Sequence, residues 1–420
     1  MMQLLKKYSW YGLLPIAIIL MFVFNNSSYS YSVYFSIFSS IFFSIFILIR
    51  KNTVVVKVEI FFIMLLCLFF WATVTSFFAD QYISSSIVRS FLVFFPLILL
   101  YLALNQYKDL AQVFNLFSYL FVIYSLFLSV VAIILFFWGD VGSNGKNSIQ
   151  FLAFGPFSIS QVIMGSSLAP RVSSLTPNPN TFAGINTIGI PLLVYLYRNN
   201  TVKFKYFILI FSFLVVGVFL TLSRAGMAAV ILSLIVLYTL DRNFLKFFKK
   251  SLFIVISISF LYLIVGKIVD YYNNFRNEVG LSDRDLAWKE MIFSIENNLF
   301  TGIGFGVSSE KLFGNLEDVG SGHNSYLIIT SEIGLIGFLL FLCIWVIFLL
   351  KSFNVYFYSE YYKNIASTII AVNFSWIIIQ TFEGQFLRFH AVNYVFFFMG
   401  MMMCILNKKS FQKRIYKEVT

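Results

Sequence analysis

The sequence is dominated by apolar runs, each long enough to cross a lipid bilayer as a helix. A membrane-spanning helix needs roughly 20 predominantly apolar residues. Twelve such runs occur along the 420 residues: 9–25, 31–49, 58–78, 85–104, 112–138, 181–197, 205–222, 224–240, 251–268, 325–350, 364–382 and 389–406. Charged residues make up only 11% of the chain, which excludes an ordinary soluble domain. The sequence therefore predicts an all-α, polytopic membrane protein with twelve transmembrane helices.

Basic residues predict the orientation of these helices. If the N-terminus is cytoplasmic, most of the 30 Lys and Arg residues lie in cytoplasmic loops or in the C-terminal tail, and the external loops 26–30 and 79–84 contain none. Cytoplasmic loops are enriched in Lys and Arg, so we expect both termini to be cytoplasmic. The same distribution accounts for the net charge of +12, and we expect no nucleic-acid partner. The first run lacks a following small-residue cleavage site, and we interpret it as a helix rather than a signal peptide.

Two long loops, 139–180 and 269–324, are external in this topology. The second is acidic, with nine Asp and Glu residues against four basic ones. Long loops usually carry function, so we expect the site on the outer face. We divide the chain into N-terminal helices (1–138), a catalytic region (139–350) and C-terminal helices with a basic tail (351–420).

A polar cluster precedes each of three helices that start at the outer face. Residues 171–180 precede one span and end in Asn178-Pro-Asn180, residues 221–226 carry Ser223 and Arg224, and residues 320–326 carry His323. The N-terminus of a helix has unpaired N–H groups and the positive end of the helix dipole, so it attracts anions. The three clusters together predict an anion-binding site.

Two arginines and one histidine are the strongest candidates for chemistry. Arg171 and Arg224 have the geometry for a bidentate clamp on a phosphate or pyrophosphate, although a single arginine often extends to lipid headgroups instead. His323 is a candidate general base, with the alternative of a helix-capping role. His390, the other histidine, lies in no motif.

The segment Gly302-Ile-Gly304-Phe-Gly306 superficially suggests a phosphate-binding loop. A nucleotide-binding loop requires a preceding strand, which the sequence does not predict here. We interpret the segment as a loop that passes close to another group, such as a ligand. No metal-ligand spacing is present, and we expect neither a metal nor another cofactor.

These motifs, in this order, resemble the O-antigen ligase and polymerase family (WaaL and Wzy type). The fullest match is His323-Asn324, followed after nine residues by Gly334-Leu-Ile-Gly337. The stretches Thr221–Gly226 and Asn178–Asn180 are also similar to family motifs. Arg284 and Trp288, followed by Gly302-Ile-Gly304, resemble the run that closes the family's large external loop between helices 9 and 10. The resemblance covers about residues 165–345.

The resemblance implies a metal-independent glycosyltransferase of the GT-C type that acts on undecaprenyl-pyrophosphate-linked glycans. The expected location is the bacterial cytoplasmic membrane, with an extracytoplasmic active site. By the same resemblance, Arg171 and Arg224 would hold the pyrophosphate, and His323 would activate the acceptor hydroxyl. The residues expected to contact substrate are Arg284, Asn324, Asn180, Asn178, Arg89, Ser223 and Tyr326. For Arg89, extension to lipid headgroups is the alternative.

The motifs leave the acceptor open. We favour a polymerase, which extends another lipid-linked repeat, over a ligase, which attaches the glycan to lipid A-core. A non-enzymatic glycolipid flippase is the alternative from another class, but it would need a polar central cavity, whereas the polar clusters lie at one face. Expected partners are lipid-linked glycans, membrane lipids, and a chain-length regulator and flippase of the same pathway.

Overall fold

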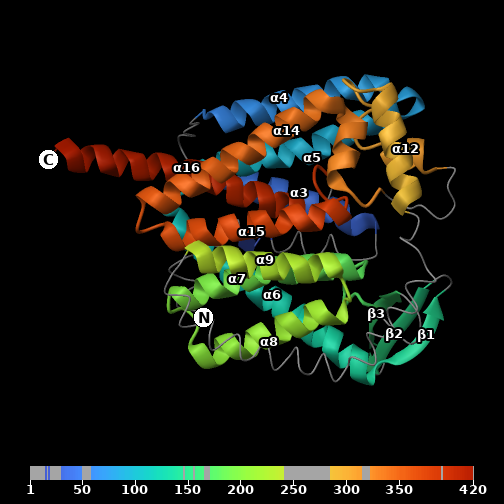
Figure 1. Cartoon of the computed structure of the whole chain (residues 1–420), viewed down its shortest axis with the longest axis horizontal. Helices are drawn as coiled ribbons and strands as arrows, with labels where there is room; N and C mark the ends of the chain where they lie inside the picture. Colours follow the sequence, from blue (N-terminus) through green and yellow to red (C-terminus); the bar gives the residue numbers. More distant parts are fainter. Residues whose placement is uncertain are drawn as a thin grey trace.

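The computed structural model describes residues 15–16, 18, 30–49, 58–144, 147–154, 157–164, 171–240, 284–314, 322–388 and 391–419. Most of these residues are helical, and the long helices run roughly along one axis (Figure 1). The helices are α3 (Ser30–Ile49), α4 (Ile60–Thr75), α5 (Ile83–Asn105), α6 (Leu110–Trp138), α7 (Pro179–Arg198), α8 (Phe204–Leu220), α9 (Arg224–Leu240), α12 (Arg284–Asn297), α13 (Ser308–Leu312), α14 (Ser325–Tyr358), α15 (Lys363–Phe382) and α16 (Ala391–Val419). Two short 3-10 helices, η1 (Ser76–Phe78) and η2 (Asp80–Tyr82), connect α4 to α5.

Several helices have the length and apolar character of membrane spans. Five candidate spans lie within the described ranges: Ile60–Phe78, Asp80–Asn105, Leu110–Trp138, Ser325–Tyr358 and Lys363–Phe382. Helices α8 and α9 are shorter and also apolar. The prediction of a mostly helical protein is therefore confirmed, and the five candidate spans are consistent with a polytopic membrane protein. The number of twelve spans stays a prediction, because the run 251–268 and most of 9–25 lie outside the described residues.

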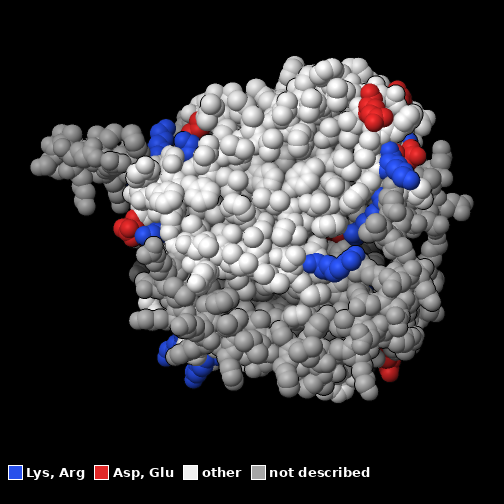
Figure 2. Space-filling model, in the orientation of Figure 1, with Lys and Arg blue, Asp and Glu red and all other residues white. Residues whose placement is uncertain are grey.

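The surface between the ends of the helices suits a lipid environment. On the face shown in Figure 2, the charged side chains lie near the two ends of the helices, and the surface between them carries none among the described residues. Large apolar side chains are exposed on the spans, including Phe70 of α4, Phe91 of α5 and Phe127 of α6. Because a helix satisfies its own backbone hydrogen bonds, such a surface can face hydrocarbon.

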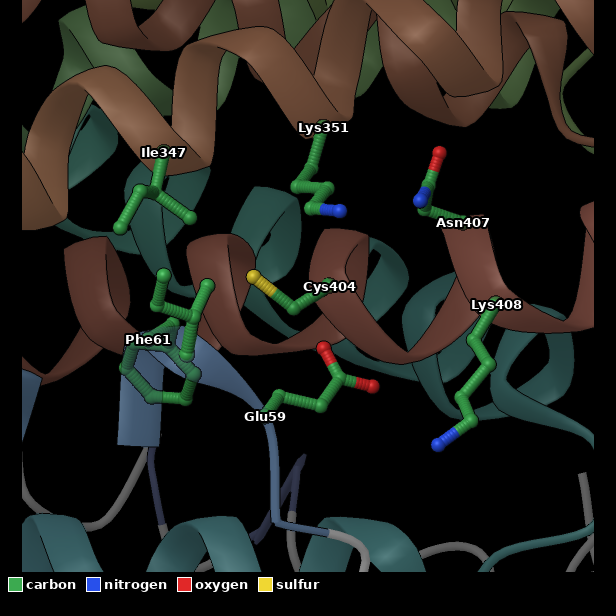
Figure 3. A pocket seen from close by; sticks show the side chains of 8 residues that line it. Glu59, Phe61, Ile347, Lys351, Cys404, Asn407 and Lys408 are labelled. Carbon is green, nitrogen blue, oxygen red and sulfur yellow. The ribbon is translucent and has the colours of Figure 1, made fainter. Parts of the chain in front are cut away.

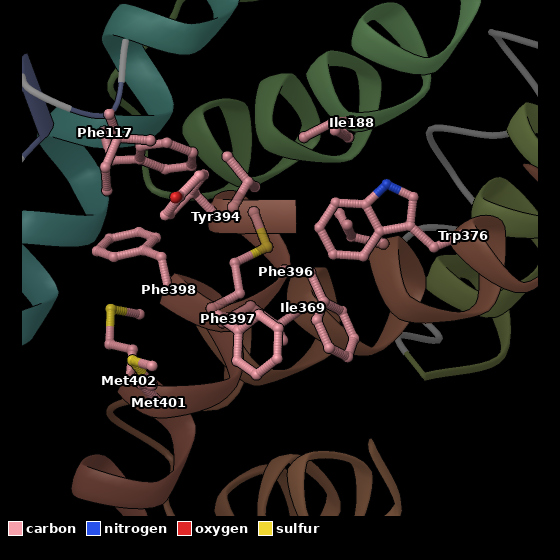
Figure 4. Close-up of a cluster of buried hydrophobic side chains, with 14 of the residues drawn as sticks. Phe117, Ile188, Ile369, Trp376, Tyr394, Phe396, Phe397, Phe398, Met401 and Met402 are labelled. Atoms are coloured by element: carbon pink, nitrogen blue, oxygen red, sulfur yellow. The ribbon is translucent and has the colours of Figure 1, made fainter. Parts of the chain in front are cut away.

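Aromatic and sulfur-containing side chains fill the space between α6, α7, α15 and α16 (Figure 4). The rings of Trp376 and Phe396 pack with centroids 5.5 Å apart, and those of Phe117 and Phe398 lie 4.9 Å apart. Met401 and Met402 are fully buried beside them. Inside a bilayer such contacts hold helices together mainly by close packing, because lipid tails are as apolar as the side chains.

A four-stranded antiparallel sheet lies beside α6 at one end of the bundle (Figure 1). Its strands follow one another in chain order: β1 (Asp140–Asn144), β2 (Asn147–Phe154), β3 (Phe157–Met164) and β4 (Arg171–Val172). The expected all-α fold was therefore incomplete, since loop 139–180 was not predicted to contain strands. Only the first four residues of β3, from Phe157 to Ser160, alternate apolar and polar residues with the two-residue period of a strand.

Helix α14 is kinked at Gly334, where the glycine-rich segment docks. Ile303 N–H donates to Ser331 O at 2.9 Å, and Gly304 N–H donates to Glu332 O at 3.0 Å. The group that the Gly302–Gly306 segment approaches is thus α14 of the same chain. Gly334 has φ 66° and ψ −178°, a conformation essentially restricted to glycine.

We predict that Gly334→Ala prevents normal accumulation of the protein. A Cβ atom at this position would lie 2.1 Å from Phe300 O, and the backbone conformation itself would cost about 1–3 kcal/mol. Membrane abundance and thermal unfolding in detergent measure the effect. Gly184→Ala in α7 is the matched control, because its Cβ would meet only Ile379 Cδ1, at 4.0 Å. Wild-type stability of Gly334→Ala would contradict this account of the kink.

Candidate active site

The three polar clusters predicted from the sequence lie at the same end of the bundle. Helices α7, α9 and α14 all begin there, and we call it the site end. Arg171 Nε donates to Thr221 O at 3.1 Å, which links the first cluster to the second. Asn180 Nδ2 and the Ser325 backbone N–H both donate to Glu383, at 2.6 and 3.1 Å, which links the first cluster to the third. Glu383 therefore joins two helix starts that are far apart in the sequence.

Three of the predicted substrate contacts cap these helices. Asn178 Oδ1 accepts a hydrogen bond from Thr181 N at 2.8 Å, and Ser223 Oγ accepts one from Gly226 N at 3.2 Å. Asn324 Oδ1 accepts from the N–H groups of residues 326 and 327 at 3.0 and 3.1 Å. Ser223 therefore caps the start of α9. Because capping satisfies otherwise unpaired N–H groups, these side chains orient the neighbouring Arg224 and His323.

Arg171 is held in a fixed position. It lies on the short strand β4, which pairs with β3 in the register Met164 to Arg171. Its Nη2 donates to Asn180 Oδ1 at 2.8 Å, in addition to the Nε bond to Thr221 O. Asn180 thus connects the guanidinium of Arg171 to the carboxylate of Glu383.

Glu383 is the site residue that the sequence did not predict. It directly follows α15, and only 6% of its side chain is exposed. Its Oε1 lies 4.0 Å from Arg284 Nη2 and 3.9 Å from His323 Nδ1. Burial raises the pKa of Glu383 to about 7, against the opposing effects of the Asn180 hydrogen bond and the charges of Arg284 and Arg171. The one local signal in the sequence is an acidic residue directly after an apolar span.

His323 lies in a turn just before α14, with a backbone φ of 44°. The turn is held by α12, because Trp288 Nε1 donates to Gly322 O at 3.0 Å. The imidazole is 37% exposed, yet its Nδ1 is buried and has no hydrogen-bond partner among the described residues. Burial and the charge of Arg284 lower the pKa of His323 to about 4. The imidazole is therefore neutral at pH 7, the form a general base requires.

Arg224, the first residue of α9, is exposed. Within the described part of the chain it has no hydrogen-bond or ion-pair partner. Arg224 lies three residues after Thr221, and the carbonyl oxygen of Thr221 accepts the hydrogen bond from Arg171. The site end thus combines one fixed arginine with one whose guanidinium is open to a ligand.

Arg89 and Tyr326, both predicted to contact substrate, have other contacts in the structure. Arg89 donates to Gly306 O and forms an ion pair with Glu310. Burial alone would raise the pKa of Glu310, but Arg89 outweighs it and holds that pKa below its ordinary value. The Tyr326 ring stacks on Trp345, with centroids 6.2 Å apart. The contacts of Arg89 connect α5 to the 302–310 segment. The contact of Tyr326 connects the start of α14 to the part of the same helix beyond the kink.

A second buried glutamate stabilises the same end. Glu332 is 3% exposed, and its carboxylate accepts hydrogen bonds from Gly306 N at 2.9 Å and Ser308 N at 3.2 Å. Arg388 Nη2 donates to Glu332 Oε1 at 2.6 Å. The two backbone hydrogen bonds to Glu332 attach the glycine-rich segment to α14, and this attachment also holds the preceding helix α12 near the start of α14.

A cavity of about 410 Å³ lies at the opposite end of the bundle (Figure 3). Its lining combines apolar side chains with charged and polar ones: Glu59, Ile60, Phe61, Ile347, Lys351, Cys404, Asn407 and Lys408. None of the predicted site residues contributes to it. The cavity and the site end are therefore separate features.

The apolar spans fit a polytopic membrane protein, and the ionic cluster at one end of its helices is its candidate site. The family model described as O-Antigen ligase matches residues 207–342, from α8 to the first turns of α14 after the kink. This match supports the resemblance of the chain to the O-antigen ligase and polymerase family. The match does not distinguish a ligase from a polymerase. A comparison with curated proteins gives no match.

Proposed function

We propose that the protein is a polysaccharide polymerase that joins undecaprenyl-pyrophosphate-linked oligosaccharide repeat units. The reaction takes place on the outer face of the bacterial cytoplasmic membrane, with both termini of the chain cytoplasmic. The observation that carries the proposal is the convergence of Arg171, Arg284 and His323 around Glu383 in a chain of this family.

In this mechanism the arginines bind the donor. Arg224 is exposed at a helix N-terminus, where an anion is favoured, and Arg171 is fixed beside it through Thr221 O. Both guanidinium groups contact the pyrophosphate and stabilise the negative charge that develops on it as it leaves. Arg284, 24% exposed at the start of α12, adds positive charge on the other side of the site.

His323 supplies the base. Its neutral imidazole accepts the proton of the acceptor hydroxyl as that oxygen attacks the anomeric carbon of the donor. The bond between the anomeric carbon and the pyrophosphate oxygen breaks, and the pyrophosphate leaves with the electron pair. One glycosidic bond forms, and the proton remains on His323 until it passes to solvent.

The packing of the bundle supports transfer rather than flipping. A flippase needs a polar path across the membrane, whereas aromatic and methionine side chains fill the space around Trp376, Phe396 and Met402 (Figure 4). Within the described ranges, the charged side chains lie instead near the ends of the membrane-spanning helices. A ligase shares the donor and the chemistry, so the acceptor alone separates it from a polymerase.

Deletion of the gene, with complementation by the full-length chain, tests the proposal. A polymerase predicts loss of long glycan chains, with a single repeat retained on the final acceptor. Accumulation of long chains on undecaprenyl would instead indicate a ligase. Normal long chains on the normal acceptor after deletion would overturn both transferase functions.

A further inference from the structure

We propose that Glu383 is a positioning residue for the transfer reaction, orienting the His323 imidazole through Nδ1 and the Arg171 guanidinium through Asn180. The inference deepens the proposed function and rests on it. Glu383 belongs to none of the motifs that link the chain to its family, and it lies outside the matched residues 207–342.

The buried Nδ1 atom of His323 carries the first step. Buried polar atoms nearly always have a hydrogen-bond partner, but among the described residues Nδ1 has none. Glu383 Oε1 lies 3.9 Å away, beyond hydrogen-bond length, and a small rotation of the partly exposed imidazole would close the gap. A hydrogen bond from Nδ1–H to Glu383 would leave Nε2 as the acceptor of the substrate proton.

Charge balance carries the second step. When His323 takes the proton it becomes an imidazolium, within a site that already holds Arg171 and Arg284. Arg224 of α9 adds a third cation at the same end. Among the described groups that face His323, Glu383 is the carboxylate that offsets the new charge.

A rigid support holds the carboxylate. Glu383 O accepts hydrogen bonds from both the backbone N–H and the hydroxyl of Ser325, at 3.1 and 2.8 Å. The Ser325 hydroxyl oxygen in turn accepts from Gln385 N at 3.0 Å. The turn after α15 is thereby fixed to the start of α14, two residues after His323. Such support is what a positioning residue requires.

The tautomer of His323 gives a test that does not depend on activity. The chain contains only two histidines, so a full-length His390→Gln protein labelled with 15N-histidine reports on His323 alone. We expect the Nδ1–H tautomer in this protein in lipid nanodiscs, and its loss when Glu383→Ala is added. Glu332→Gln is the matched control, since it removes charge from a buried glutamate that contacts Arg388 rather than His323. An unchanged tautomer in Glu383→Ala would overturn the inference.

The pH dependence of transfer gives the second test. Because burial raises the pKa of Glu383 to about 7, the wild-type rate should rise with pH as this carboxyl ionises. Arg171, Arg284 and Arg224 stay charged over this range, and His323 stays neutral above its pKa of about 4. Glu383→Gln should transfer about 10²-fold more slowly and lose the rise near pH 7, whereas Glu383→Asp should recover part of the rate.

The outcomes separate the inference from the proposed function. A wild-type rate and pH profile in Glu383→Gln, combined with an inactive His323→Ala protein, would overturn the role of Glu383 alone. Full activity in His323→Ala would overturn the proposed mechanism. The assay uses the full-length protein and a lipid-pyrophosphate-linked oligosaccharide, with product length as the readout.

Discussion

His323→Ala is expected to lower the rate of glycan transfer by about 10²–10⁴-fold while leaving membrane abundance unchanged. A general base is removed, but the imidazole is 37% exposed and makes no hydrogen bond through its buried Nδ1 to the described residues. Little folding free energy therefore depends on it. The turn itself is held by Trp288 at Gly322 and by the Asn324 cap, both of which remain in the variant.

Quantification of chain length in cells and of transfer by purified protein measures this effect. The control is His390→Ala, which removes the other histidine of the sequence and should behave as wild type. Added imidazole should restore part of the rate of His323→Ala, because a small base can enter the vacated, partly exposed position. Normal glycan ladders in His323→Ala would exclude the residue as the base.

Arg224→Ala is expected to lower transfer by about 10²–10³-fold, the usual loss when one group that stabilises a developing negative charge is removed. The exposed guanidinium has no partner in the described chain, so removing it should leave the unfolding temperature nearly unchanged. Arg224→Lys should remain poor, because lysine keeps the charge and loses the two parallel hydrogen bonds to a phosphate.

Arg171 differs from Arg224 in that its guanidinium is hydrogen-bonded within the protein. Arg171→Ala should also lower the rate of transfer, but with reduced stability of the protein, because the hydrogen bonds to Thr221 O and Asn180 are lost. Each such bond contributes about 0.5–1.5 kcal/mol. Lys203→Ala, an exposed cation at the opposite end, is the matched control. If Arg224→Ala transfers normally at wild-type abundance, this arginine does not bind the donor.

The structure gives the His-Asn and Gly-x-x-Gly pattern a physical meaning. Asn324 caps α14 and fixes His323 just before the helix. Gly334 lies nine residues after Ser325 and allows the kink against which residues 299–304 dock. Because α12 leads directly into this segment, the docking also keeps Arg284 near the imidazole. The pattern therefore positions the site as well as supplying its base.

Sequence alone determined the features that depend on local composition. The apolar runs predicted membrane helices, and the run 224–240 has the same bounds as α9. The polar clusters before α7, α9 and α14 predicted one site, because alternating helices return to the same side of a membrane. Each of these follows from neighbouring residues and helix geometry.

Tertiary structure alone decided which distant groups meet. Asn180 and Glu383 are 203 residues apart in the chain, and Arg89 and Glu310 are 221 apart. Nothing near Glu383 in the sequence marks it as the carboxylate between Arg171, Arg284 and His323, or Arg89 as the partner of Glu310 rather than of a lipid phosphate. A helix start can be read from a few adjacent residues, whereas a buried ion pair depends on how whole helices pack, and packing is a property of the complete fold.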